Sequence, residues 1–217
     1  MKKIGVVLSG CGVADGSEIH EAVFTLLAID RMGAEAVCMA PNADFPATNH
    51  LVMQESGDKR NALVESARIA RGKIQDIQEV KADQLDAIIF PGGYGAAKNL
   101  CDFAMQGAAA SVHPEIARLV LEIVAAGKPI GAICISPALI AAVLGRELEP
   151  TLTIGNDSGT AAEIEKTGAR HQDCAMREIV IDRKNKIVST PAYMLAGHIS
   201  EVCDGIDRCV REVIAMA

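Results

Sequence analysis

The sequence has few aromatic residues, with no tryptophan, two tyrosines and four phenylalanines among 217 residues. This shortage disfavours the stacking of bases on aromatic side chains, which is a usual basis of single-stranded nucleic-acid binding. The net charge of -7 also gives no indication of a basic surface for a phosphate backbone or for anionic lipid. We therefore expect neither nucleic acid nor a membrane as a partner.

Long hydrophobic runs and paired metal-binding or redox motifs are also absent. No apolar stretch approaches the length of a membrane span, and the one near the N-terminus is too short for a secretion signal. The seven cysteines show no C-x-x-C spacing, and the histidines show no H-x-x-x-H pattern. We expect no disulfide framework, no metal or other cofactor, and a reducing, cytoplasmic location.

Short apolar segments that end at glycine, proline or a turn alternate with segments of helical spacing. This alternation predicts one domain, residues 1–217, with an α/β fold: a flavodoxin-like, doubly wound, mostly parallel sheet with a small antiparallel hairpin. Residues 42–60 are polar and are predicted to form a long surface loop. The expected strands are 3–9, 36–40, 85–90, 129–134 and 151–154, with a hairpin of 178–182 and 186–190; the expected helices are 17–32, 61–72, 115–126, 136–144, 159–167 and one from about 194.

Cys134 ends one of these strands and is followed at once by a helical segment, Ser136 to about 144. A tight turn between a strand and a helix displays a nucleophile at the carboxyl edge of the sheet. The helix N-terminus is expected to acidify the thiol and so favour the reactive thiolate. The alternative is a buried cysteine of the core, which is the commoner role of this residue.

Two further features are predicted at the same edge. The backbone N–H groups of the turn 91–95, with its Gly92-Gly93 pair, are suited to stabilise an oxyanion, although the same sequence also suits a plain turn. Glu18 and Glu21 lie near the start of the first helix, where either carboxyl could serve Cys134 as an acid or base or could simply interact with the helix dipole.

The histidines give no clear partner for the cysteine. His20, His50 and His113 precede it, and His171 and His198 follow it without the spacing of a Cys-His-Glu triad. The glycine-rich segment 10–16 precedes a helix but does not match a phosphate-binding pattern, so a nucleotide site is disfavoured.

The segments 9–22, 91–100, 132–134 and 190–196 together resemble the ElbB branch of the DJ-1/PfpI superfamily, which has a class I glutamine-amidotransferase-like fold. The resemblance covers essentially the whole chain. It implies a homodimer and a cofactor-free glyoxalase that converts a small dicarbonyl, glyoxal and secondarily methylglyoxal, to the 2-hydroxy acid. It also implies a link to isoprenoid biosynthesis.

Matched residue by residue, the resemblance gives Cys134 the nucleophile's role and gives Glu21, rather than Glu18, the role of the carboxyl that contacts it. Gly93 with the backbone N–H groups of Tyr94 and Ile135 takes the place of the oxyanion donors. Many superfamily members carry a histidine directly after the cysteine, where this chain has Ile135. That difference disfavours protease or amidotransferase activity and implies slow turnover.

Two alternatives stay open on the sequence alone. A reactive Cys134 without a histidine also suits a redox-sensing or accessory protein of isoprenoid biosynthesis. An amidotransferase-like hydrolase is a weaker possibility, because it would need a histidine beside Cys134. The contacts of the Cys134 thiol discriminate between them.

Overall fold

The computed structural model describes all residues, 1–217, and is built around a seven-stranded sheet with the order β10-β11-β7-β6-β1-β2-β5. All pairs in this sheet are parallel except the hairpin of β10 and β11. The predicted α/β fold with a mostly parallel sheet and a late antiparallel hairpin is confirmed. The strands are β1 Lys3–Val7, β2 Glu35–Ala40, β5 Ile74–Asp76, β6 Ala87–Phe90, β7 Ile130–Ile133, β10 Val180–Asp182 and β11 Ile187–Thr190.

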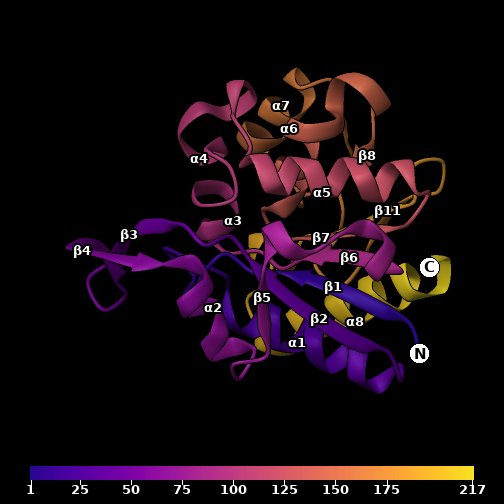
Figure 1. Cartoon of the computed structure of the whole chain (residues 1–217). Coiled ribbons are helices and arrows are strands. Elements are labelled where there is room, and N and C mark those ends of the chain that lie inside the picture. The colour runs from indigo at the N-terminus through magenta and orange to yellow at the C-terminus, as the bar shows by residue number, and fades with distance from the viewer.

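Helices cover both faces of the sheet, with α5, α6 and α7 on one side and α1, α2 and α8 on the other (Figure 1). The central strands are buried on both faces, because successive side chains point alternately into two hydrophobic cores. The principal helices are α1 Ile19–Arg31, α2 Ala62–Ile69, α5 Pro114–Ala125, α6 Ser136–Leu148, α7 Ser158–Lys166 and α8 Ile199–Met216. None of them combines the length and hydrophobicity needed to cross a bilayer.

The segment expected to be a surface loop, 42–60, instead contains an antiparallel hairpin of β3 Asp44–Asn49 and β4 Gln54–Asn61. Seven of the eight residues of β4 are exposed, so the strand has no apolar alternation that sequence reasoning could detect. The hairpin projects from the body of the protein (Figure 1).

Four other elements differ from the expected pattern. The edge strand β5 has three residues and was not predicted. Two short helices, α3 Tyr94–Lys98 and α4 Phe103–Gln106, follow the Gly92-Gly93 turn. The strand expected at 151–154 is shorter, β8 Thr151–Leu152, and pairs with β9 Arg170–His171 in a separate small sheet.

Candidate active site

Cys134 lies in the turn between β7 and α6, at the carboxyl edge of the sheet. Its φ of +62° is in the left-handed region, which costs energy for any residue other than glycine and is typical of functional turns. Neighbouring segments fix this turn: the Cys134 N–H donates to the Thr190 carbonyl at 2.9 Å, and the Ser136 hydroxyl donates to the Pro91 carbonyl at 2.8 Å. The strand, turn and helix expected around Cys134 are therefore present.

Glu21 projects from the first turn of α1 toward Cys134 and is completely buried. Its carboxyl is hydrogen-bonded to the Cys134 thiol. Oε2 accepts from the Gly92 N–H at 2.9 Å, and Oε1 accepts from the Tyr193 N–H at 3.2 Å. The structure thus brings together the cysteine and the glutamate that the sequence singled out.

Gly92 lies against both members of this pair. A Cβ atom at position 92 would lie 2.5 Å from Glu21 Oε2 and 3.0 Å from Cys134 Sγ, closer than carbon can approach these atoms without displacing them. Only glycine allows the backbone to pass there while Glu21 and Cys134 keep their contact.

Two backbone N–H groups point at the Cys134 sulfur, those of Gly93 and Ile135. The third expected donor, Tyr94, needs correction, because its N–H donates to the Val13 carbonyl at 2.8 Å and is not available to an oxyanion. Tyr94 begins α3 and contributes its side chain to the cavity instead. An oxyanion next to the sulfur would therefore be held by Gly93 and Ile135.

Burial raises the pKa of both reacting groups. The pKa of Glu21 rises from 4.5 to about 8, through burial and the nearby Glu18 carboxylate, so its carboxyl is protonated at neutral pH. The pKa of Cys134 is also raised above its ordinary value, by burial and by Glu21. The expected acidification of the thiol is therefore wrong: loss of water outweighs the two N–H donors and the helix N-terminus.

Glu18 and His20 form a second layer around the pair. Glu18 is the N-cap of α1, and its Oε2 accepts the Glu21 N–H at 2.7 Å. His20 Nδ1 lies 2.8 Å from the Tyr193 hydroxyl and 3.8 Å from Glu18 Oε1. The contact between His20 and Tyr193 was not predicted from the sequence, although both residues lie in the segments that carried the family resemblance.

A cavity of about 790 Å³ opens in front of Cys134. No histidine, lysine or arginine lines it, and no group of three or more histidine, cysteine or acidic residues in the structure could hold a metal. His198, the last histidine considered as a base, is instead the N-cap residue of α8. A Cys-His-Glu triad is therefore not formed. The cavity is lined by Val13, Glu18, Gly93, Tyr94, Ala97, Phe103, Ala104, Met105, Gln106, Gly107, Cys134, Ile135, Asp157, Gly159, Thr160, Glu163, Tyr193 and Met194.

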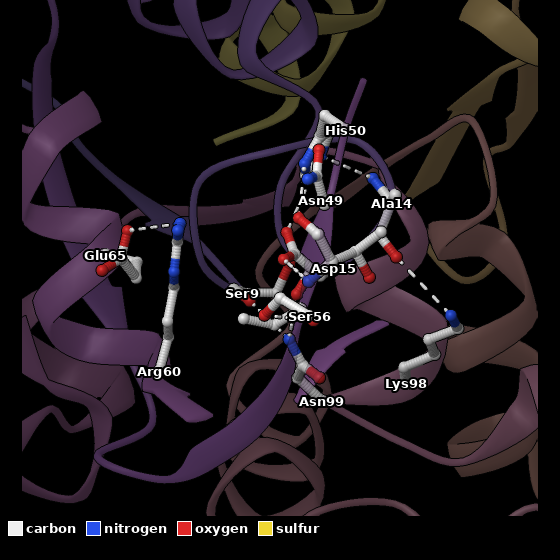
Figure 2. A network of polar contacts seen from close by, with 12 residues as sticks. Ser9, Ala14, Asp15, Asn49, His50, Ser56, Arg60, Glu65, Lys98 and Asn99 are labelled. Carbon is white, nitrogen blue, oxygen red and sulfur yellow. Dashed lines mark hydrogen bonds and ion pairs between the residues drawn. The ribbon is translucent and has the colours of Figure 1, made fainter. Parts of the chain in front are cut away.

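Several groups of the glycine-rich loop 10–16 are hydrogen-bonded to neighbouring segments of the protein, and Figure 2 shows some of these contacts. The N–H groups of Gly10 and Ala14 donate to Ser66 Oγ at 2.9 Å and to His50 Nε2 at 3.2 Å. The buried Asp15 carboxylate accepts the Thr48 N–H at 2.6 Å, and so attaches the β3–β4 hairpin to the loop. Because these donors are occupied, they are not available to a phosphate.

No protein-family model matches the chain. A human protein, glutamine amidotransferase-like class 1 domain-containing protein 3, mitochondrial, is 44% identical over 99% of this chain and 83% of its own length. The zebrafish ES1 protein, mitochondrial, is 35% identical over 98% of this chain and 85% of its own length. The rat ES1 homologue also carries a mitochondrial name. These names overturn the expected cytoplasmic location, which rested only on the cysteine pattern.

Solved structures agree with the fold. The crystal structure of an isoprenoid biosynthesis protein with an amidotransferase-like domain from Ehrlichia chaffeensis has a TM-score of 0.94 and 39% identity, over 100% of this chain and 99% of that one. Drosophila melanogaster DJ-1beta has a TM-score of 0.60 at 13% identity, over 100% of this chain and 95% of that one. This second similarity concerns the fold alone.

Proposed function

Because this chain belongs to the glutamine amidotransferase-like class 1 family, which has the DJ-1/PfpI fold and includes the ES1 proteins, we propose that it is a cofactor-independent glyoxalase of the ElbB branch. Its substrate would be a small dicarbonyl, glyoxal or methylglyoxal, and its product the 2-hydroxy acid.

One observation carries this proposal: the Glu21 carboxyl is hydrogen-bonded to the Cys134 thiol, with no histidine in the cavity. A thiol that has a carboxyl as its only proton partner can add to an aldehyde, because the same carboxyl can take up and return the proton. The contacts of the Gly93 and Ile135 N–H groups with the Cys134 sulfur support a role for them in stabilising the oxyanion that this addition forms.

The first step joins the sulfur of Cys134 to the aldehyde carbon. In the form of the pair that has lost one proton, the thiol proton passes to the Glu21 carboxylate and then to the new oxyanion, which gives a hemithioacetal. The Glu21 carboxylate next removes the hydrogen of this carbon as a proton and gives it to the oxygen of the neighbouring carbonyl, which forms an enediol. It then takes the proton of the former hemithioacetal hydroxyl and delivers it to the neighbouring carbon, which leaves a carbonyl group on the carbon bonded to sulfur. The resulting thioester is hydrolysed by water, which releases the hydroxy acid and restores the thiol.

We propose that Tyr193 assists at the second carbonyl. Its side chain lines the cavity, and His20 contacts its hydroxyl at 2.8 Å. A hydrogen bond from this hydroxyl to the second carbonyl oxygen would stabilise the negative charge of the enediol. Tyr193 is therefore our candidate for the further donor that the reaction needs, and His20 for the residue that positions it.

The test is the conversion of glyoxal to glycolate by purified protein free of glutathione, with Cys134→Ala and, as a matched control, Cys203→Ala. We expect Cys134→Ala to abolish turnover and Cys203→Ala, which changes a half-exposed cysteine of α8 outside the cavity, to leave it intact. Equal turnover by wild type and Cys134→Ala would refute the mechanism.

The alternatives are less well supported by the site. A redox sensor needs an accessible thiol with a lowered pKa, whereas Cys134 is 7% exposed and its pKa is raised. Amidotransferase-like hydrolysis needs a base such as histidine next to the cysteine, and none lines the cavity. The name of the Ehrlichia protein supports placing the activity in the context of isoprenoid biosynthesis.

We also propose that the chain forms a homodimer. One face of α1 exposes Ile19, Val23 and Leu27, spaced four residues apart, while its other face packs into the core. An apolar stripe of this kind on a helix surface is typical of a protein interface. Because α1 also carries Glu18, His20 and Glu21, association along it would stabilise the helix that presents the proton carrier.

A further inference from the structure

The cavity is much larger than the dicarbonyl considered so far. Its volume of about 790 Å³ falls within the range of pockets that hold drug-sized ligands, about 300–1,000 Å³. Glyoxal has only two carbons and two oxygens, so it would occupy the space next to Cys134 and leave most of the cavity filled with water. The unfilled part is the region that a larger substrate would use.

The walls of the cavity are mainly apolar. Ten of the eighteen lining residues are hydrophobic. Tyr94 of α3, Met105 of α4 and Val13 of the glycine-rich loop are each more than one third exposed. These side chains, together with Phe103 and Met194, offer an apolar surface that a substituent of the substrate would remove from water.

The charged groups of the cavity all have the same sign. Glu18, Asp157 and Glu163 line it, and Asp157 and Glu163 come from the start and the middle of α7. Glu163 pairs with Lys166, but Lys166 itself does not line the cavity. Lys98 lies over the Tyr94 ring at 5.3 Å and also stays outside. An anionic substituent would therefore meet carboxylates and no cation.

We propose that the site takes 2-oxoaldehydes whose second substituent is bulky, apolar and not anionic. The aldehyde carbon lies against Cys134, and the substituent extends between α3–α4 and α7. This inference rests on the proposed glyoxalase reaction and deepens it, because it names the substrate class. It also excludes carboxylated and phosphorylated oxoaldehydes.

The test compares glyoxal, methylglyoxal, phenylglyoxal and 4-carboxyphenylglyoxal as substrates of the full chain. We expect kcat/KM to rise by at least about tenfold from glyoxal to phenylglyoxal, because the ring buries apolar area. For 4-carboxyphenylglyoxal, which carries a carboxylate on the same ring, most of this increase in kcat/KM should be lost. Equal or lower kcat/KM for phenylglyoxal, or equal kcat/KM for its carboxylated form, would overturn the proposal.

Charge selection can be tested separately with Asp157→Asn. Asparagine also caps helices, so the N-terminus of α7 should persist after the carboxylate is removed. We expect the preference for phenylglyoxal over 4-carboxyphenylglyoxal to narrow by about threefold or more. The control is Glu165→Gln, on the same helix but outside the cavity, which should not change this preference. If both variants changed this preference equally, charge selection by the carboxylates of the cavity would be contradicted.

A binding measurement distinguishes this inference from the glyoxalase proposal. Acetophenone and 4-acetylbenzoate are unreactive analogues, and each can be tested for slowing the alkylation of Cys134 by iodoacetamide, followed by mass spectrometry. Protection by acetophenone but not by 4-acetylbenzoate supports the substrate class even if no dicarbonyl is turned over. Equal protection, or none, contradicts it whether or not glyoxal is converted.

Discussion

The backbone N–H of Tyr193 donates to Oε1 of Glu21 at 3.2 Å across 172 positions of sequence. The contact ties the segment after β11 to the first turn of α1, next to Cys134. Both carboxyl oxygens of Glu21 accept from backbone N–H groups, since Gly92 supplies the other donor. These two backbone donors therefore fix the position of the Glu21 carboxyl. Substitution of Glu21 alone can then test how its protonation affects the reaction.

The rate of the proposed reaction should rise with pH through about 8. At lower pH both Glu21 and Cys134 hold a proton, and the first proton that the pair loses generates its reactive form. The apparent pKa belongs to the pair, whichever atom carries the remaining proton. The measurement is kcat/KM for glyoxal between pH 5 and 10, from which the rate with Cys134→Ala is subtracted to remove reaction with hydroxide.

The variant Glu21→Gln tests whether Glu21 causes this pH dependence of kcat/KM. The amide cannot exchange the proton, so we expect kcat/KM to fall by about a hundredfold or more and the rise near pH 8 to disappear. A profile of unchanged shape in Glu21→Gln would show that another group accepts the thiol proton.

Burial of Glu21 should also make the protein less stable as the pH rises. Its pKa is 4.5 in an exposed reference state and about 8 in the folded protein. Between these values the folded protein keeps a proton that the unfolded chain has released. The free energy of unfolding should therefore fall by up to about 1.4 kcal/mol per pH unit from this group.

Urea unfolding of wild type and Glu21→Gln at pH 5 and pH 8 measures this contribution. The variant loses one hydrogen bond, because its amide NH₂ faces a backbone donor, and this offset is the same at both pH values. We expect the variant to lose less stability between pH 5 and pH 8 than the wild type. Parallel pH dependence in the two proteins would mean that Glu21 is ionised throughout.

The sequence predicted the elements with strong hydrophobic patterns and missed those without. The strand and helix around Cys134 follow from an apolar run and a proline-containing helix start, and they were located within a few residues. The β3–β4 hairpin is held by backbone pairing, and most of its side chains are exposed, so it has no such pattern.

The features of the site likewise divide into those that were expected from the sequence and those that were not. The approach of Glu21 to Cys134 was expected from the family resemblance, because both belong to segments with a matching pattern. The raised pKa of Cys134 was not expected, because it depends on how completely the folded protein excludes water from the thiol. The loss of Tyr94 as an oxyanion donor depends on a carbonyl from a distant loop, that of Val13.

Gly92→Ala should inactivate the protein without unfolding it. The new methyl group would press on Glu21 Oε2 and Cys134 Sγ, and a displacement of about 1 Å at a reacting group costs about a hundredfold in rate. Overpacking should lower the free energy of unfolding by about 1–3 kcal/mol. The control is Gly197→Ala, where nothing lies within 4 Å of the added carbon. Full activity of Gly92→Ala would contradict the need for contact between the pair.

Val23→Glu should disrupt the proposed homodimer. Val23 is 45% exposed in the centre of the apolar stripe of α1, so a charge there would be buried without a partner on association. Light scattering after size-exclusion chromatography should give the mass of one chain for this variant and of two for the wild type. Val64→Glu changes a more exposed valine on α2, which is 62% exposed, and should leave the mass unchanged. A monomeric wild type, or a Val23→Glu dimer, would reject this interface.

Tyr193→Phe tests whether the hydroxyl beside His20 takes part in the reaction. The substitution keeps the ring in the cavity wall and the backbone N–H on Glu21, and removes only the contact of the hydroxyl with His20 Nδ1. Loss of one transition-state donor costs about a hundredfold to a thousandfold in kcat, with less effect on KM.

His20→Asn separates catalysis from positioning. It keeps the tyrosine hydroxyl and removes only the ring that contacts it, so kcat should fall by less than in Tyr193→Phe. The two substitutions together should cost no more than Tyr193→Phe alone, because both act through the same hydroxyl. Additive losses would show that His20 acts independently of Tyr193, and an unchanged kcat in Tyr193→Phe would leave the enediol charge to the N–H groups of Gly93 and Ile135.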